Sequence, residues 1–140
     1  MAAITDAKSW SLTCLIAPDT SLSFLDQAGT PTSLEAFNPV QLLLSAAAGC
    51  LAKVCASLVE ANQLPAYPIT VAITGHKPAG PLPGKGLNAM DVTVTFDAQA
   101  QASGLDYSKA QALVAKAKTL CTVTNTLSPA VTFAVSVTPF

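Results

Sequence analysis

The feature that most constrains the fold of this chain is a long apolar segment that begins at Asn38-Pro39. Asn can cap the free N–H groups of a helix and Pro is tolerated at the first helical position, so a helix is predicted to start here. From there to about Ala61, apolar residues recur every three and four positions on more than one side of the helix. Gly49 in its interior costs about 1 kcal/mol relative to Ala and requires a packing reason. The rest of the chain must therefore bury a central helix at 38–62 on several sides.

Strand patterns surround this segment on both sides in the sequence. Residues 1–35 contain alternating apolar and polar positions, clearest at 10–16, and predict a small N-terminal meander of strands. Residues 68–97 alternate as two strands of a hairpin, joined by the Pro- and Gly-rich loop 78–86. A last alternating run at 130–138 predicts a final strand.

A second helical segment is predicted over residues 106–127, between the hairpin and the last strand. Asp106 or Ser108 can cap its start, its apolar side carries Cys121, and its last residues either extend the helix or start a short further turn. Strands, a long buried helix, two strands, a helix and a strand make a mixed order. This order is typical of an α+β fold and not of a parallel doubly wound sheet, and residues 1–140 are predicted to form one domain.

Few charges are available to cover such a fold. Only 11% of the residues are charged and 51% are hydrophobic, against roughly 25% charged residues in ordinary soluble domains. Either part of the surface is hidden in an oligomer, or Ser, Thr, Ala and Gln cover the exposed faces. The first alternative is favoured, because a small monomer with so few charges is poorly soluble.

The charge balance and the hydropathy pattern exclude several kinds of partner. The net charge of −1 gives no electrostatic footprint for nucleic acid or for an anionic membrane surface. The longest near-apolar run, at 42–52, is too short to span a bilayer, and the N-terminal residues lack the pattern of a signal peptide. We therefore expect a cytoplasmic protein that binds neither nucleic acid nor membrane.

Four cysteines, Cys14, Cys50, Cys55 and Cys121, are the residues most able to carry chemistry. In a cytoplasmic chain they are catalytic, redox-active or simply buried more often than they are structural disulfides. The sequence has no CxxC pair and no Cys/His cluster, and His76 stands alone, so no metal site and no cofactor are predicted. Cys50 and Cys55 lie about 140° apart around one helix and cannot bond to each other. Cys50 and Cys121 can meet if their helices pack together, although the commonest role of a free cysteine is that of a small buried hydrophobic residue.

The residues around two of these cysteines resemble the signature of the OsmC/Ohr family. Residues 38–51, NPVQLLLSAAAGCL, are similar to the family's Asn/Ser-Pro start of a long central helix of small and aliphatic residues that ends in Ala/Gly-Cys. Residues 121–125, CTVTN, are similar to the family's Cys-Pro/Ser/Thr-Val segment, which follows an amphipathic helix. The resemblance extends from Asn38 to the C-terminus, and residues 1–35 match only as a strand-rich lead-in.

This resemblance implies a tightly intertwined homodimer in which antiparallel sheets wrap around the two central helices. The better-known family members are thiol peroxidases that reduce organic or hydrogen peroxides, with the thiols at the subunit interface. By this similarity Cys50 is the peroxidatic thiol and Cys121 the resolving thiol. The implied partners are a second copy of the chain, a small peroxide and a dithiol reductant.

Two departures from the family pattern bear on these implications. The family's peroxidases place a Glu in the first turn of the central helix, where this chain has Val40 and Gln41, and they use an Arg near the thiol, whereas all seven basic residues here are Lys. An Arg would lower the pKa of the thiol, so its loss weakens thiolate activation. Three residues are candidate auxiliaries: Glu35 as a substitute carboxylate, Lys53 as a substitute cation and Gln41 as a hydrogen-bonding group. A Lys in the position of Lys53 is more often a side chain that reaches solvent.

The sequence therefore leaves two functions open. The first is a weak or altered thiol peroxidase, and the presence of both Cys50 and Cys121 favours it. The second is a non-peroxidase family member that senses redox state or binds a small apolar ligand, and the loss of both activating charges favours it. Cys14 and Cys55 are expected only to fill space.

Overall fold

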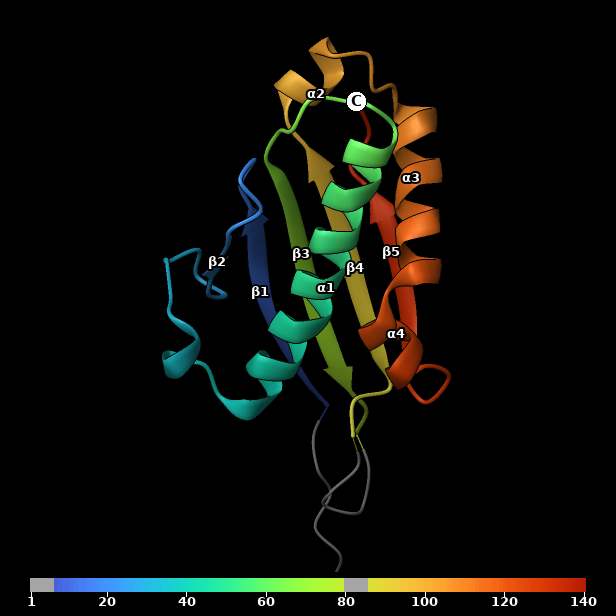
Figure 1. Ribbon diagram of the computed structural model, residues 1–140. Coiled ribbons are helices and arrows are strands. Elements are labelled where there is room, and N and C mark those ends of the chain that lie inside the picture. Colours follow the sequence, from blue (N-terminus) through green and yellow to red (C-terminus); the bar gives the residue numbers. More distant parts are fainter. Residues whose placement is uncertain (1–6, 80–85) are drawn as a thin grey trace, which may run out of the picture.

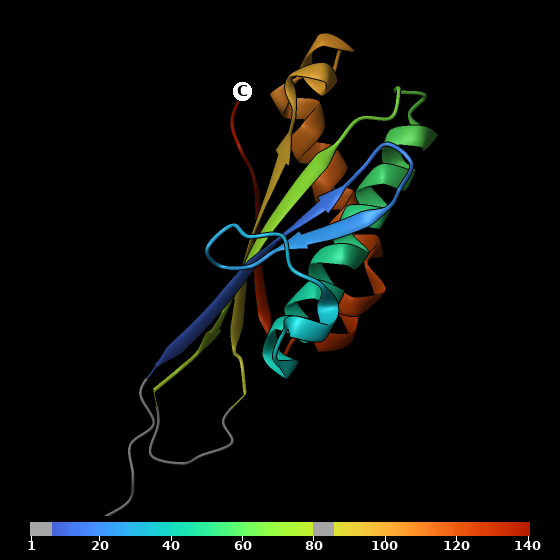
Figure 2. The same ribbon diagram turned by 90° about the vertical axis from the view of Figure 1, so that its left-hand side faces the viewer.

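The computed structural model describes residues 7–79 and 86–140, and the described chain forms two layers. One layer is a single five-stranded sheet, and the other consists of helices on one of its faces. The long helix α1 (Pro39–Ala61) crosses in front of the sheet with α3 (Tyr107–Leu120) beside it (Figure 1). Figure 2 shows the molecule from the side, with the helices together on one side of the sheet. This architecture confirms the α+β class that the sequence predicts.

The sheet has the strand order β2-β1-β3-β4-β5. Its strands are β1 (Lys8–Ile16), β2 (Leu22–Leu25), β3 (Ile69–Lys77), β4 (Ala89–Phe96) and β5 (Thr132–Val137). Neighbouring strands run antiparallel apart from β4 and β5, which are parallel. The sheet thus differs from the expected antiparallel arrangement at this last pair. The reason is that β5 returns to the sheet after a long helical crossover. Such a crossover can join parallel strands, whereas a tight hairpin joins only antiparallel strands.

Side-chain hydrogen bonds pair backbone N–H groups at the start of α1 and determine where the helix begins. Asn38 accepts a hydrogen bond from the backbone N–H of Gln41 (2.9 Å), and the Gln41 Oε1 accepts one from the N–H of Asn38 (3.0 Å). With Pro39 as the first helical residue, this capping box pairs N–H groups that have no partner inside the helix. Gly49 has a packing reason, because a Cβ there would lie 3.2 Å from the Leu22 Cδ1. The glycine allows β2 to pack closely across the middle of α1.

Three shorter helices connect β4 with β5. Asp97 caps α2 (Ala98–Ala102), a helix that the sequence analysis does not predict. Asp106 caps α3 by accepting a hydrogen bond from the N–H of Lys109 (2.7 Å). The helical segment predicted at 106–127 is divided at Cys121, where extended backbone ends α3 and begins α4 (Thr122–Leu127). The chain therefore presents the start of a new helix directly after this cysteine.

The core lies between the sheet and the helices. Residues such as Cys14, Val71 and Val94 on β1, β3 and β4 are fully buried against the helical layer. No described helix covers the opposite face of the sheet, which carries mainly Ser, Thr and Ala, together with a hydrogen bond between the side chains of His76 and Asp91 (2.7 Å). Hydroxyl and methyl groups thus cover part of the surface of this charge-poor chain. This agrees with the alternative in which Ser, Thr, Ala and Gln cover the exposed faces.

The helix α1 is long and apolar enough to cross a membrane if only its length and composition are considered. Its most apolar stretch is 56% buried inside the protein, and α1 packs against β1, β3 and α3. It is therefore the core helix of this fold. The loop predicted at 78–86 falls largely outside the described residues.

Candidate functional site

Cys50 lies in the middle of α1, on the side that faces α4 and an open groove. Its side chain is half-buried, whereas Cys121, at the junction of α3 and α4, is completely buried. The two thiols are neighbours, and the Cys121 thiol raises the pKa of Cys50. The structure thus brings together the two cysteines that the sequence analysis singles out, through the packing of α4 on α1.

The start of α4 lies beside the Cys50 sulfur. The backbone N–H groups of Val123 and Thr122 lower the pKa of the Cys50 thiol. The first N–H groups of a helix have no acceptor inside it, and α4 begins at Thr122, so both groups are available for this sulfur. They stabilise negative charge on it, and the charged thiolate is the form of cysteine that attacks peroxides and disulfides.

Burial nonetheless raises the pKa of the Cys50 thiol above its ordinary value of 9.0. The N–H group of Val123 opposes this rise, the neighbouring Cys121 thiol adds to it, and the N–H group of Thr122 opposes it more weakly. The two backbone donors therefore offset part of the desolvation but do not reverse it. At neutral pH most Cys50 side chains are neutral thiols.

An open groove of about 730 Å³ runs along α1 beside Cys50, and we name it the Cys50 groove. Its walls come from β2, from the short 3₁₀ helix Leu34–Ala36 and from α1 itself. Lys53 is the one charged residue among the described residues that line it. The larger apolar wall residues are Leu22, Phe24, Leu34, Leu42 and Val54. Cys50 is thus accessible from an apolar surface.

The three candidate auxiliary residues lie in different places. Lys53 is one turn beyond Cys50 and lines the same groove with an exposed side chain. Gln41 uses its Oε1 in the cap of α1 and is not part of the groove lining. Glu35 is exposed in the 3₁₀ helix, and only its neighbour Leu34 lines the groove. Lys53 alone shares a surface with Cys50.

Cys14 and Cys55 lie in the core between α1 and the sheet. Both side chains are completely buried, and burial raises the pKa of each thiol to about 12. They are therefore neutral and sealed from solvent. Within the two described ranges, no group of His, Cys, Asp and Glu side chains is arranged to hold a metal ion.

Sequence reasoning missed the two backbone donors at the start of α4. Any residue except proline has an N–H group, so this kind of site has no residue-type signature. The β-branched residues Thr122, Val123 and Thr124 after Cys121 were a weak signal, because they lower helix propensity and favour a break in the predicted helix.

A family model described as OsmC-like protein matches residues 29–136 of this chain. The chain belongs to the OsmC-like family. The matched range contains both Cys50 and Cys121, and the resemblance that rests on the motifs around them is confirmed.

Solved structures of OsmC-like proteins share this fold. The OsmC-like protein from Mycoplasma pneumoniae is 18% identical, with a TM-score of 0.62 over 94% of this chain and 97% of that one. The organic hydroperoxide resistance protein OsmC from Legionella pneumophila is 20% identical, with a TM-score of 0.54 over 97% and 98% of the two chains. The organic hydroperoxide resistance protein OhrB of Bacillus subtilis is 16% identical, with a TM-score of 0.53 over 96% and 98%. No curated protein sequence matches the chain.

Proposed function

We propose that this OsmC-like protein is a slow thiol-dependent peroxidase that reduces organic or hydrogen peroxides. The observation that carries the proposal is the pairing of a half-buried Cys50 with a fully buried Cys121 at the wall of an apolar groove. Such a pair offers one thiol that a substrate can reach and a second thiol that only the first can reach. The hydroperoxide resistance proteins of Legionella and Bacillus, which share the fold, support the same chemistry.

The reaction has two oxidative steps and then a reduction. The Cys50 thiolate attacks one oxygen of the peroxide, the O–O bond breaks, and the departing alkoxide takes up a proton and leaves as an alcohol, while Cys50 becomes a sulfenic acid. The Cys121 thiol then attacks the Cys50 sulfur, which forms a disulfide and releases water. A dithiol reductant exchanges with this disulfide and returns both cysteines to thiols.

The small amount of thiolate at Cys50 limits the rate. The chain has no Arg. Glu35 does not line the Cys50 groove, and the neutral side chain of Gln41 is used in the cap of α1. The N–H groups of Thr122 and Val123 replace part of the missing stabilisation, yet the pKa of Cys50 stays raised. Each pKa unit above the working pH lowers the thiolate fraction about tenfold, so turnover is slower than at a site with a cation beside the thiol.

A second copy of the chain is the proposed occupant of the open side of α1. Leu34 and Leu42, which line the Cys50 groove, are 47% and 40% exposed, and the adjacent Leu43 is 37% exposed. Apolar patches of this kind mark interaction surfaces, and a two-fold pair would cover both copies of the patch at once. The thiol sites would then lie at the subunit interface. A cytoplasmic location fits this chemistry, because thiols are kept reduced there.

Light scattering tests the homodimer with a matched pair of variants. Leu42→Glu places a charge in the groove and is expected to give a monomer at micromolar concentration. Thr93→Glu places the same charge on the exposed face of the sheet and should leave the dimer intact. A folded monomer in the wild-type protein at the same concentration would overturn this part of the proposal.

Binding of a small apolar ligand without turnover is the second candidate function. It is supported by the size and the mainly apolar walls of the Cys50 groove, which at about 730 Å³ is within the usual range for small-molecule sites. In this alternative Cys50 reports on redox state or contacts the ligand but does not turn over peroxide.

Peroxide consumption with dithiothreitol as reductant separates the two functions. The wild-type protein is expected to consume cumene hydroperoxide in proportion to its concentration, and Cys50→Ser should abolish this consumption. Cys55→Ala, a change at a buried cysteine on the same helix, is the control and should keep it. If the wild-type protein consumes no more peroxide than Cys50→Ser, the peroxidase proposal fails and the ligand-binding function remains.

A further inference from the structure

One positive charge lies in the Cys50 groove without a counter-charge. Lys53 is the only charged residue among the described residues that line this groove, and its side chain is exposed there. Within the described ranges, no carboxylate oxygen lies within 4.0 Å of its ammonium group. The ammonium is therefore available to a negatively charged group of a molecule that enters the groove.

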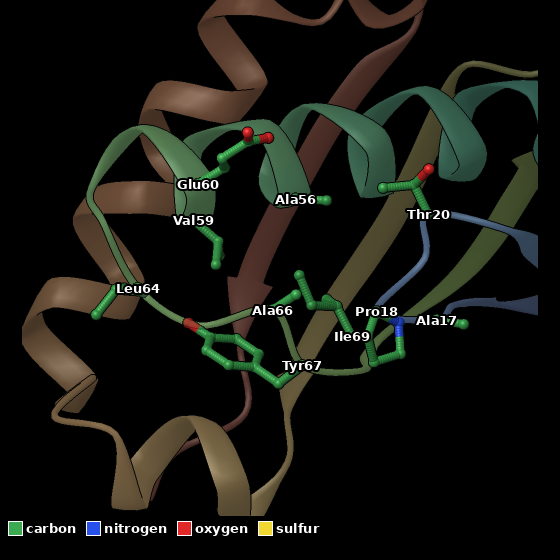
Figure 3. A pocket seen from close by; sticks show the side chains of 10 residues that line it. All are labelled: Ala17, Pro18, Thr20, Ala56, Val59, Glu60, Leu64, Ala66, Tyr67 and Ile69. Atoms are coloured by element: carbon green, nitrogen blue, oxygen red, sulfur yellow. The ribbon is translucent and has the colours of Figure 1, made fainter.

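The acidic residues nearest to Lys53 in the sequence lie outside this groove. Glu60 follows Lys53 by two turns of α1, about 10 Å along the helix axis. It lines a separate cavity at the C-terminal end of α1 (Figure 3), which shares no lining residue with the Cys50 groove. Glu35 is exposed on the 3₁₀ helix and does not line the groove either. Neither carboxylate neutralises the charge of Lys53.

Cys50 and Lys53 lie close together on one side of α1. They are three residues apart, about 4.5 Å along the helix axis, and both line the groove. The pKa of Cys50 is shifted by burial, by the first N–H groups of α4 and by the Cys121 thiol, and Lys53 does not contribute to this shift. A molecule in the groove can thus contact the sulfur and the ammonium at once, and the ammonium acts on that molecule and not on the sulfur.

The walls around these two residues suit an apolar body. Leu22 and Phe24 of β2 and Val54 of α1 line the groove and are half-buried, so a hydrocarbon ring or short chain can pack on them. Leu42, part of the exposed patch assigned to a second copy of the chain, lies about 16 Å from Lys53 along the axis of α1. The cation and this patch are therefore at different ends of the groove.

We propose that Lys53 determines substrate specificity at the Cys50 site, which prefers organic hydroperoxides that have an apolar body and a carboxylate about one helical turn away from the peroxide. This inference rests on the proposed peroxidase function and names its substrate class. The peroxide group meets the Cys50 sulfur, the apolar body packs on the walls, and the carboxylate accepts a charge-assisted hydrogen bond from the Lys53 ammonium. A neutral hydroperoxide makes only the first two contacts.

A matched pair of hydroperoxides tests this preference. Consumption of cumene hydroperoxide is compared with that of its derivative with a carboxylate para to the peroxide-bearing carbon, with dithiothreitol as reductant. At low salt the ratio of the two rates, carboxylate to neutral, should be about two- to fivefold higher in the wild-type protein than in Lys53→Gln, the range expected for an exposed ion pair. About 0.5 M NaCl should remove most of this difference by screening.

Two further variants separate the position of the charge from its presence. Lys53→Arg keeps a cation in the groove and should keep the preference for the carboxylate. Lys116→Gln removes the same charge from an exposed position on α3 outside the groove lining, and it should also keep the preference. A loss in Lys116→Gln equal to that in Lys53→Gln would overturn the inference, because net charge and not the groove would then attract the anion.

A binding measurement keeps the inference testable if the protein does not turn over peroxide. The probes are 4-isopropylbenzoate and 4-isopropylbenzamide, which lack the peroxide group and differ in charge. In methyl NMR titrations of Cys50→Ser, we expect saturable shifts at Leu22 and Val54, with the benzoate bound about two- to fivefold more tightly than the benzamide. Addition of Lys53→Gln to this variant should make the two affinities equal.

The two proposals fail in different ways. Absence of peroxide consumption by the wild-type protein would refute the peroxidase function, and the binding preference would still decide the role of Lys53. An unchanged ratio of rates or of affinities on substitution of Lys53 by Gln would overturn the inference while leaving the peroxidase function intact. No saturable binding of either probe would overturn it as well. Circular dichroism and light scattering check that each variant is folded and keeps the oligomeric state of the wild-type protein.

Discussion

Two sets of cysteines, each with one member on α1, lie in different surroundings. Cys50 is half-buried at the wall of an apolar groove, lies beside the N–H groups at the start of α4, and has Cys121 as its neighbour. Cys14 and Cys55 are fully buried, and burial raises the pKa of each thiol to about 12, with the Cys121 thiol adding to the rise at Cys55. The residue type is the same in both sets. Solvent access and nearby N–H groups therefore distinguish Cys50 as the cysteine that a reagent can reach.

The geometry of α1 produces this difference within a single helix. Cys50 and Cys55 are five residues apart, which turns them about 140° away from each other. One position therefore faces the groove and α4, while the other faces the interior.

Native labelling with iodoacetamide should give the largest contrast. We expect Cys50 to react at least about 100-fold faster than Cys14 or Cys55, because a thiol with a pKa of about 12 holds almost no thiolate at neutral pH and its sulfur is sealed from solvent. Mass spectrometry of tryptic peptides measures the three rates, and unfolding in urea should remove the difference. Equal labelling of Cys50 and Cys55 in the native protein would contradict the expected difference in reactivity.

The pH dependence of the Cys50 reaction should be steep. Because burial raises its pKa above 9.0, the thiolate fraction rises with pH throughout the neutral range. We expect the rate of alkylation to increase about tenfold per pH unit between pH 7 and 8.5. Stopped-flow kinetics with a thiol reagent measures this profile, and a plateau below pH 8 would mean that an unrecognised cation activates the thiol.

The two sets should also differ in their contribution to stability, and here substitution of the buried cysteine should have the larger effect. Cys55→Ala removes a completely buried sulfur and leaves a small cavity, so the free energy of unfolding should fall by about 1–2 kcal/mol. Cys50→Ala at the half-buried groove wall should cost less than about 0.5 kcal/mol. Urea unfolding at one fixed protein concentration compares the two variants. A larger loss for Cys50→Ala would mean that Cys50 is mainly a packing residue.

The smallest expected effect concerns the donors at the start of α4. Thr122→Pro removes one N–H group that lowers the pKa of Cys50, at a first helical position where Pro is tolerated. The pKa of Cys50 should rise further, and its alkylation should slow by about two- to threefold. Thr122→Ala keeps the N–H group and is the matched control, because the Thr122 side chain is exposed. Equal rates in the two variants would show that this donor does not affect the thiol.

Much of the fold could be predicted because its signals are local. Asn38-Pro39 forms the capping box that begins α1, and alternation of apolar and polar residues gives the strands. The parallel pairing of β4 with β5 could not be predicted in this way, since strand direction depends on the long crossover between them. The short helix after Asp97 was missed because a helix of five residues has too little periodicity to detect.

The candidate site was predicted only in part. The motifs around Cys50 and Cys121 selected two positions that the fold makes neighbours. Of the auxiliary residues, Gln41 caps α1 and Glu35 lies outside the groove. Their positions could not be predicted, because sequence spacing does not define the direction of a side chain. The main-chain donors of Thr122 and Val123 carry no residue-type signal, so only the break between α3 and α4 reveals them.

The central claim is that Cys50 and Cys121 form one redox pair, and disulfide mapping tests it most directly. Reduced protein is treated with one equivalent of cumene hydroperoxide, alkylated and digested for mass spectrometry. We predict a Cys50–Cys121 disulfide that forms slowly, is absent in Cys50→Ser, and leaves Cys14 and Cys55 as free thiols. If Cys50 and Cys121 both remain free after prolonged treatment, or if Cys50 stops at a sulfenic acid while Cys121 stays reduced, the claim is contradicted.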